Sequence, residues 1–411
     1  MRQLLAITAL LLGCISMWAQ TKNNEMKYNK IQVEDCNVFY REAGSPEKPA
    51  ILLLHGFPSS SHMFRELMPE LAGEYHLIAP DFPAFGQTDS PDREHFTYSF
   101  DHLARIVDKF TEAIGLTKFA MYVFDYGAPI GYRLALWHPE RITAIISQNG
   151  NMYEEGLGKK WEARKEYWKN PTDELRQQFA SAYALETIIG QYTFGTPEGS
   201  VGPDGYSLDY YYVCQPGRAE IQNDLILDYR SNVALYPEFQ KYLRTYQPPL
   251  LAVWGENDPS FIPEGAKAFK RDVPNAEIHF VPSGHFALES HHTEIAKLIK
   301  NFLAIEPKTS FQNKRARTLT DIRRSRVPAR CFLHIIIFYS PSISSSVRPV
   351  IDIISFTSYP LFFMRQAVCI RLLWTAVSAF ACSFCSHSDQ SVSFRYCITC
   401  SSSGVRSSSM T

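Results

Sequence analysis

The chain has 411 residues, of which 45% are hydrophobic and 20% are charged, so it is long enough to bury a large core. Its formal net charge is -1. Proteins that bind nucleic acid usually present a basic face, so this charge balance gives no reason to expect a nucleic-acid partner.

The first twenty residues, MRQLLAITALLLGCISMWAQ, have the pattern of a secretory signal peptide. Arg2 precedes an apolar run, and Ala19 supplies a small residue for cleavage. We therefore predict a signal peptide over residues 1–19 and export of the mature protein to the periplasm or beyond. The alternative is lipoprotein processing at Cys14, and we expect a membrane anchor only in that case.

Residues 27–150 alternate between strand and helix patterns. The segment NKIQVEDCNVFYREAG alternates apolar and polar residues, which predicts a hairpin. Four continuous apolar runs bounded by turn residues (AILLLHG, YHLIAPDF, FAMYVFD and ITAIISQNG) predict buried strands, and helical patterns occupy residues 63–73 and 103–114. This alternation is typical of a parallel sheet that helices cover on both faces.

Residues 151–244 have a different pattern, rich in Trp, Tyr, Glu and Arg and without a comparable strand. Strand patterns return in PPLLAVWGEND and AEIHFVPSGH, and the helical pattern HTEIAKLIKNFL follows them. We therefore predict an α/β fold with a mostly parallel sheet flanked by helices. Residues 27–150 and 245–305 form its core, and residues 151–244 form an inserted helical cap.

Residues 306–411 differ in composition from the rest of the chain, with no Lys, Glu or Asn after Lys314. We interpret them as a disordered or non-functional extension. Six of the nine cysteines lie here, and the last four have the spacing C-x2-C-x11-C-x2-C, which admits a zinc interpretation although the spacer is short. We expect neither a metal nor a cofactor. Before this segment, Cys36 and Cys214 are predicted to be unpaired.

The segment YVFDYGAPIGYRLA, residues 122–135, predicts a strand, a sharp turn and a helix, with Asp125 at the turn where many hydrolases carry a serine. A carboxylate with a pKa near 3.9 is already an anion at neutral pH, so it can attack without a base. Gly127 and Gly131 would let the helix pack closely on the sheet. The alternative interpretation is that Asp125 only caps the helix.

Three further residues follow predicted strands. Phe57 lies in HGFP after the strand AILLL, where its amide and that of Tyr126 would form an oxyanion hole. Asp258 and His285 each follow a later strand, and open α/β sheets build their sites at such carboxyl ends. The order Asp125, Asp258, His285 is the nucleophile, acid and base order of this architecture.

Taken together, HGFPSS, APDFPAFGQTD, FDYGAPIG, WGENDP and SGHF make residues 30–304 resemble the α/β-hydrolase superfamily. The aspartate resembles that of one branch, the epoxide hydrolases and haloalkane dehalogenases. Attack of a carboxylate on a tetrahedral carbon gives an alkyl ester, which His285, oriented by Asp258, would hydrolyse by activating water. The expected partners are a small apolar epoxide or halogenated substrate and water.

The leaving group separates the two activities. As the resemblance implies, dehalogenases usually hold the halide with a tryptophan after the nucleophile and an Asn or second Trp, but here these positions are Tyr126 and Phe57. Epoxide hydrolases use cap tyrosines as donors, and we predict Tyr192 and Tyr229 for this role. Epoxide hydrolysis is the leading hypothesis, haloalkane dehalogenation the alternative, and a non-catalytic binding protein of the same fold a third possibility.

Overall fold

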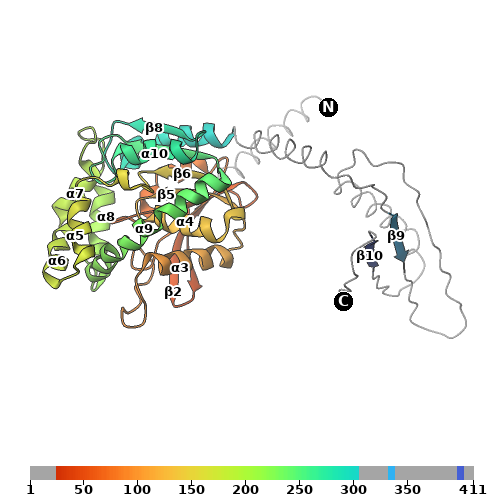
Figure 1. The fold of residues 1–411 in the computed structure, drawn as a ribbon, viewed down its shortest axis with the longest axis horizontal. Helices are drawn as coiled ribbons and strands as arrows, with labels where there is room; N and C mark the ends of the chain where they lie inside the picture. The colour runs from red at the N-terminus through yellow and green to blue at the C-terminus, as the bar shows by residue number, and fades with distance from the viewer. Residues whose placement is uncertain (1–24, 305–331, 338–395, 402–411) are drawn as a thin grey trace, which may run out of the picture. The chain divides into compact units, whose positions relative to one another are not determined.

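The computed structural model describes residues 25–304, 332–337 and 396–401, which belong to two units, residues 1–314 and 315–411 (Figure 1). In the second unit β9 (Phe332–Ile337) pairs antiparallel with β10 (Tyr396–Ser401). The predicted signal peptide, with Cys14, lies outside the described residues, so export stays a prediction. Of the four cysteines in the zinc interpretation, Cys382 and Cys385 also lie outside them.

The first unit is built on an eight-stranded sheet with the order β1-β2-β4-β3-β5-β6-β7-β8. The pairs β1–β2 and β2–β4 are antiparallel, and all other neighbours are parallel, as the sequence patterns predicted. The strands are β1 (Lys27–Val33), β2 (Cys36–Ala43), β3 (Ala50–Leu54), β4 (His76–Pro80), β5 (Phe119–Phe124), β6 (Ile142–Gln148), β7 (Leu250–Gly255) and β8 (Glu277–Val281).

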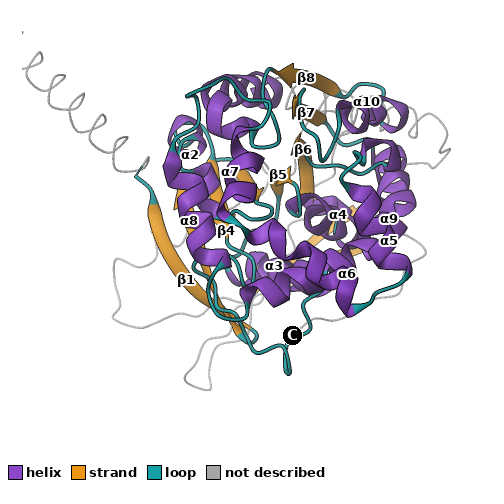
Figure 2. Ribbon diagram, turned by 90° about the vertical axis from the view of Figure 1, so that its left-hand side faces the viewer, coloured by secondary structure: helices purple, strands orange, loops and turns teal. Residues whose placement is uncertain are grey.

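The central strands are buried on both faces, which explains why their sequences are apolar without interruption. In β3, Leu52 and Leu54 belong to one core cluster, whereas Ile51 and Leu53 belong to the other. Successive side chains of a strand point to opposite faces, so each face needs its own cover. Figure 2 shows helices on both sides of the sheet.

The helices of the core are α2 (Leu67–Leu71), α3 (Phe100–Ala113), α4 (Gly127–Trp137), α10 (Pro263–Asp272) and a last helix over residues 287–304. The single helix predicted over residues 63–73 is wrong, because a 3-10 turn, η1 (Ser61–Phe64), precedes a short α2. Pro69 accounts for the difference. It lies in the first turn of α2, where its missing N–H costs little, whereas a helix from residue 63 would place it in the interior.

The predicted helical insertion is confirmed. Between β6 and β7 the chain forms five helices and two 3-10 turns, and this segment, all of it described, contains no strand. The last helix of the insertion packs on α3, α4 and α10 of the core, and it runs two residues past the predicted end of the cap at residue 244. The elements are η3 (Glu154–Gly156), α5 (Trp161–Lys169), α6 (Asp173–Gln178), η4 (Phe179–Tyr183), α7 (Leu185–Thr193), α8 (Pro203–Val213) and α9 (Arg218–Tyr246).

Two further observations concern the described residues alone. Cys36 and Cys214 are both free, as predicted, and Cys36 is buried. No helix in this part of the chain has the length and apolar character that crossing a bilayer requires.

Candidate active site

Asp125 lies at the sharp turn between β5 and α4. Its φ of 45° is in the left-handed region, which residues other than glycine rarely adopt and which is held here by close packing. A Cβ added to Gly56 would lie 2.3 Å from the Asp125 Cβ, so the loop after β3 approaches the turn closely. The residue that caps α4 is Tyr126, without a side-chain capping bond, so the helix-cap interpretation of Asp125 is wrong.

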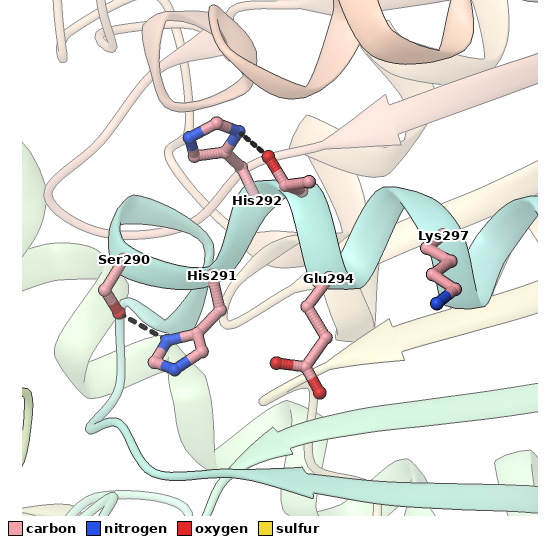
Figure 3. Close-up of a pocket in the computed structure, with 6 residues that line it drawn as sticks. Ser290, His291, His292, Glu294 and Lys297 are labelled. Atoms are coloured by element: carbon pink, nitrogen blue, oxygen red, sulfur yellow. Dashed lines mark hydrogen bonds between the residues drawn. The ribbon is translucent and has the colours of Figure 1, made fainter.

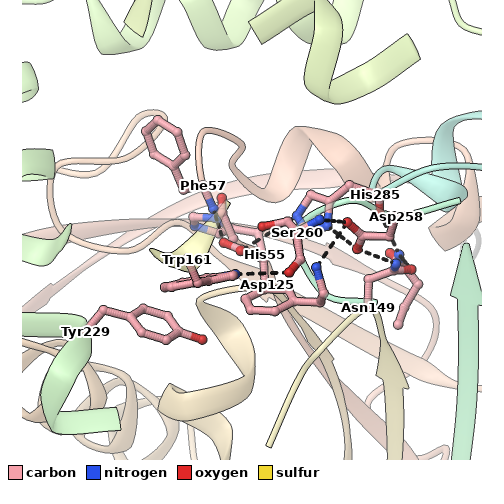
Figure 4. Close-up of polar contacts among 12 residues, drawn as sticks. His55, Phe57, Asp125, Asn149, Trp161, Tyr229, Asp258, Ser260 and His285 are labelled. Atoms are coloured by element: carbon pink, nitrogen blue, oxygen red, sulfur yellow. Dashed lines mark hydrogen bonds and ion pairs between the residues drawn. The ribbon is translucent and has the colours of Figure 1, made fainter. Parts of the chain in front are cut away.

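The Asp125 carboxylate is held between two predicted partners. Its Oδ1 accepts a hydrogen bond of 2.7 Å from the Phe57 amide, and its Oδ2 lies 3.6 Å from His285 Nε2. Tyr126 follows at the amino end of α4, where backbone N–H groups have no partner within the helix. One oxygen of the Asp125 carboxylate therefore accepts a hydrogen bond from the Phe57 amide, and the other oxygen faces His285 (Figure 4).

Asp258 and His285 come together from the loops that follow β7 and β8. His285 Nδ1 lies 2.7 Å from Asp258 Oδ2, and both side chains are buried. Asp258 Oδ1 accepts hydrogen bonds from the amides of Ser260 at 2.7 Å and Phe261 at 3.1 Å. These bonds satisfy the buried carboxylate and fix the direction in which it holds the imidazole.

Sequence reasoning missed Asn149, which directly follows β6. Its side-chain amide donates to Asp258 Oδ2 at 2.7 Å, and its Oδ1 accepts from the Gly255 amide at 3.0 Å. Its φ of 48° is again left-handed, a conformation that asparagine tolerates better than most residues. The turn QNGN at the end of a predicted strand was the available signal. Asn149 positions the acid and does not face the nucleophile.

The electrostatics of the site centre on His285. Burial lowers the pKa of this imidazole, but the carboxylates of Asp258 and Asp125 outweigh burial and raise the pKa from 6.5 to about 10. The free protein therefore holds an imidazolium between two carboxylates at neutral pH. Removal of the charge on Asp125 would remove part of the cause of this shift.

We expect histidine-selective NMR to show His285 protonated up to about pH 10 and Asp125→Asn to lower its pKa. Because the folded-state pKa exceeds the unfolded value of 6.5, the stability that this group contributes is complete below pH 6.5 and lost as the pH rises through 10. A His285 resonance that titrates near the ordinary histidine value of 6.5 would contradict the expectation.

Of the two predicted cap tyrosines, only Tyr229 lies at the site. Its ring is 5.8 Å from that of Tyr126, and the Asp125 charge adds to burial in raising the pKa of its phenol well above 10. The Tyr229 hydroxyl lies 3.5 Å from that of Tyr236, a second tyrosine on the same helix. Burial also raises the pKa of Tyr236; its hydrogen bonds with Tyr229 and Asn151 oppose the rise, and the charge of Asp125 adds to it. Tyr229 and Tyr236 form a buried pair, hereafter the phenol pair.

Tyr192 has a different environment, and its prediction as a donor needs correction. Its hydroxyl donates to the carboxylate of Asp209, and its ring stacks on Phe286 at 3.9 Å. Because its proton is already donated to the buried Asp209 side chain, this phenol is not available to a leaving group. Sequence could not separate Tyr192 from Tyr236, because both are buried tyrosines of the cap.

Aromatic side chains surround the phenol pair. The ring of Tyr229 lies 4.4 Å from Trp161, 6.2 Å from Trp168 and 6.5 Å from Phe261. Phe261 in turn lies 5.8 Å from the His285 ring. Cap and core thus enclose Asp125 with apolar surface, which excludes water and strengthens electrostatic interactions within.

His55 of the HGFP segment has a structural role. Its Nε2 accepts a hydrogen bond of 3.0 Å from the Phe82 amide, so the proton is on Nδ1, which lies 3.1 Å from the Gly56 carbonyl. Burial lowers the pKa of this imidazole to about 3, which keeps it neutral. The histidine fastens the Phe57 loop to the segment after β4.

A pocket on the surface of the last helix is separate from these residues. It is lined by residues 290–294 and Lys297, and it includes none of Asp125, Asp258 and His285 (Figure 3). Within it His292 pairs with Glu70 at 2.7 Å. This open pocket has no catalytic constellation comparable to that of Asp125.

Comparison with known proteins agrees with this architecture. The model of the α/β hydrolase fold family matches residues 49–292. An uncharacterized hydrolase of Saccharomyces cerevisiae is 46% identical over 284 residues, which span 68% of this chain and 97% of the yeast protein. Human epoxide hydrolase 4 is 25% identical over 302 residues, spanning 68% of this chain and 79% of the human protein.

Among solved structures, haloalkane dehalogenase DbeA from Bradyrhizobium elkani superposes with a TM-score of 0.58 at 19% identity, covering 69% of this chain and all of DbeA. At that identity the likeness concerns the fold. The family match and the yeast relative go further, because they cover most of the first unit at the level of sequence. The chain therefore belongs to the α/β hydrolase fold family and is a hydrolase related to the epoxide hydrolases and haloalkane dehalogenases.

Proposed function

We propose that this protein hydrolyses epoxides to diols through an ester on Asp125. The observation that carries the proposal is the phenol pair of Tyr229 and Tyr236, buried within electrostatic reach of a carboxylate that the Phe57 amide holds in place. A carboxylate nucleophile requires a tetrahedral carbon with a strained or good leaving group. Phenols that remain protonated supply the proton that an opening epoxide needs.

In the first step Asp125 Oδ2 attacks an epoxide carbon, and the carbon–oxygen bond breaks. Tyr229 gives its proton to the alkoxide, and the resulting phenolate takes the proton of the His285 imidazolium. Esterification has then removed the charge of Asp125, one cause of the raised pKa of His285. The histidine becomes a neutral base at the stage where a base is required.

In the second step His285 takes a proton from water, and the hydroxide attacks the ester carbonyl at Asp125 Cγ. The negative charge develops on Oδ1, the oxygen that the Phe57 amide already contacts at 2.7 Å, and the Tyr126 amide is the second proposed donor. Collapse breaks the ester bond. Asp125 is released as a carboxylic acid, and the departing alkoxide takes its proton. This leaves a diol and the starting enzyme.

Two tryptophans near the site bear on the alternative of dehalogenation. Trp161 Nε1 donates to the Ser260 carbonyl at 3.0 Å, and Trp168 Nε1 donates to the Ile226 carbonyl at 2.7 Å. Both indole N–H groups are thus engaged by the backbone, and neither is available to a halide. Together with Phe57 and Tyr126 at the usual halide-binding positions, this favours the epoxide.

The proposal is tested by incubating the purified protein with a panel of epoxides and a panel of haloalkanes, with diol and halide measured separately. We expect diol from epoxides at catalytic rates. Stoichiometric halide release without diol formation would assign dehalogenation instead. Absence of both products would favour a binding protein that retains the fold.

Removal of either hydroxyl of the phenol pair should slow ring opening. We expect Tyr229→Phe and Tyr236→Phe each to lower the single-turnover rate of ester formation by roughly tenfold to a hundredfold, since one transition-state hydrogen bond is lost. Tyr242→Phe, on the same helix and equally buried, is the matched control and should leave the rate unchanged. Equal rates in all three variants would exclude the phenol pair as donor.

A further inference from the structure

Arg164 lies one turn into α5, next to the aromatic side chains that surround the phenol pair. Its guanidinium carbon is 4.9 Å from the ring centroid of Trp161 and 5.9 Å from that of Phe179. Trp161 is only 4% exposed, and its ring contacts Tyr229 at 4.4 Å and Phe261 at 5.2 Å. The cation is therefore separated from the phenol pair by little more than one indole ring.

Its charge also reaches the nucleophile side of the site. Burial raises the pKa of the Tyr126 phenol, and the positive charge of Arg164 opposes that rise. Arg164 acts in the same sense on Tyr183, whose ring lies 6.0 Å from that of Phe57. Residues from α5, η4 and the nucleophile turn thus converge on this guanidinium.

Arg164 is not neutralised by the protein. Its one hydrogen bond goes to the Lys160 carbonyl at 3.0 Å, and it forms no ion pair with any acidic side chain that the structure describes. The contrast with Arg176 is clear. Arg176, also in the cap, pairs with Glu220 at 2.7 Å and Asp224 at 2.9 Å. A half-buried cation facing apolar surface without a counter-ion favours an anion from elsewhere.

We propose that Arg164 binds the carboxylate of the substrate, so that the preferred substrates are epoxides with a carboxylate several bonds from the ring, such as long-chain epoxy acids. This rests on the proposed epoxide hydrolysis and adds its substrate class. Nη1 of Arg164 donates to the Lys160 carbonyl, so within the described part of the chain the N–H groups of Nε and Nη2 stay free to bind the two oxygens of a carboxylate. The aromatic side chains around Tyr229 would contact the apolar part between the carboxylate and the epoxide.

The experiment compares an epoxy fatty acid with its methyl ester, which has the same epoxide but no charge. We expect the wild-type protein to have a kcat/KM roughly tenfold or more higher for the acid, as a charge-assisted hydrogen bond would give. Arg164→Gln should remove this preference by raising KM for the acid, with the methyl ester turned over as before. Arg164→Lys, which keeps the charge, should retain part of it.

The matched control is Arg230→Gln, which removes an exposed cap arginine bonded only to the Trp168 carbonyl and should leave the preference intact. Equal turnover of acid and ester by the wild type, or equal losses in Arg164→Gln and Arg230→Gln, would overturn the assignment of Arg164. Turnover of the ester without a preference leaves epoxide hydrolysis standing. If neither compound reacts, the proposed function itself fails.

Discussion

Replacement of His285 with glutamine is expected to stop the reaction after Asp125 has been alkylated once. The carboxylate is ionised without help from a base and keeps the Phe57 amide at 2.7 Å, so ester formation does not require the imidazole. Hydrolysis does require it, since His285 is the basic group that lies 3.6 Å from the nucleophile. Steady-state turnover should fall by roughly a hundredfold to ten-thousandfold, the usual contribution of a general base.

Intact-protein mass spectrometry after incubation with an epoxide measures this directly. The variant should carry one substrate mass, and peptide mapping should place it on Asp125. His291→Gln, in the surface pocket, is the control and should turn over at the wild-type rate without accumulating an adduct. Rapid multiple turnover by His285→Gln would remove the histidine from the proposed mechanism, and an adduct on another residue would remove Asp125.

The second large effect is expected on stability, from Gly127→Ala. A Cβ at this position would lie 2.2 Å from the Leu54 carbonyl oxygen and 2.7 Å from that of His55, and both are backbone atoms that cannot rotate away. Either α4 or β3 must shift, and both hold the turn of Asp125. We expect the free energy of unfolding to fall by roughly 3 kcal/mol or more, because overpacking here displaces backbone.

Denaturant unfolding of the two variants tests this expectation. Gly190→Ala is the control, since Gly190 lies within α7 and an added Cβ would meet no atom within 4 Å. There the alanine should raise stability by up to about 1 kcal/mol through its higher helix propensity. A Gly127→Ala protein as stable as the wild type would show that β3 and α4 are not in the close contact described.

The sequence predicted those features that follow from local pattern. Buried strands were recognisable because both faces of the sheet are covered. Asp258 was found because it follows β7, which is buried throughout, and His285 because it follows the predicted strand β8, of which Val281 alone is buried. The helix predicted over residues 63–73 failed at Pro69, where a local rule was overlooked. Its apolar spacing was continuous, but the missing N–H decides where the helix begins.

The remaining features depend on which strands and helices become neighbours. Asn149 reaches Asp258 because β6 and β7 are adjacent in the sheet, although the residues are 109 positions apart. Tyr192 and Tyr236 differ only in what lies opposite: Asp209 for the first, Tyr229 for the second. No spacing within residues 151–244 records these partners, so the choice among cap tyrosines required the packed structure.

The long helix α9 has a consequence for how this enzyme can diverge. It carries the phenol pair and is fastened to the core by Arg218 on the Gly86 carbonyl, by Asp228 on the Phe100 amide and by Asn232 on Arg133. Arg164 belongs to α5, which Trp161 fastens to the core through the Ser260 carbonyl, but the Arg164 side chain itself bonds only to the Lys160 carbonyl at the start of its own helix. The residue proposed to select the substrate and the residues proposed to donate the proton thus lie on different helices, so a change at position 164 leaves the bonds that hold α9 to the core in place.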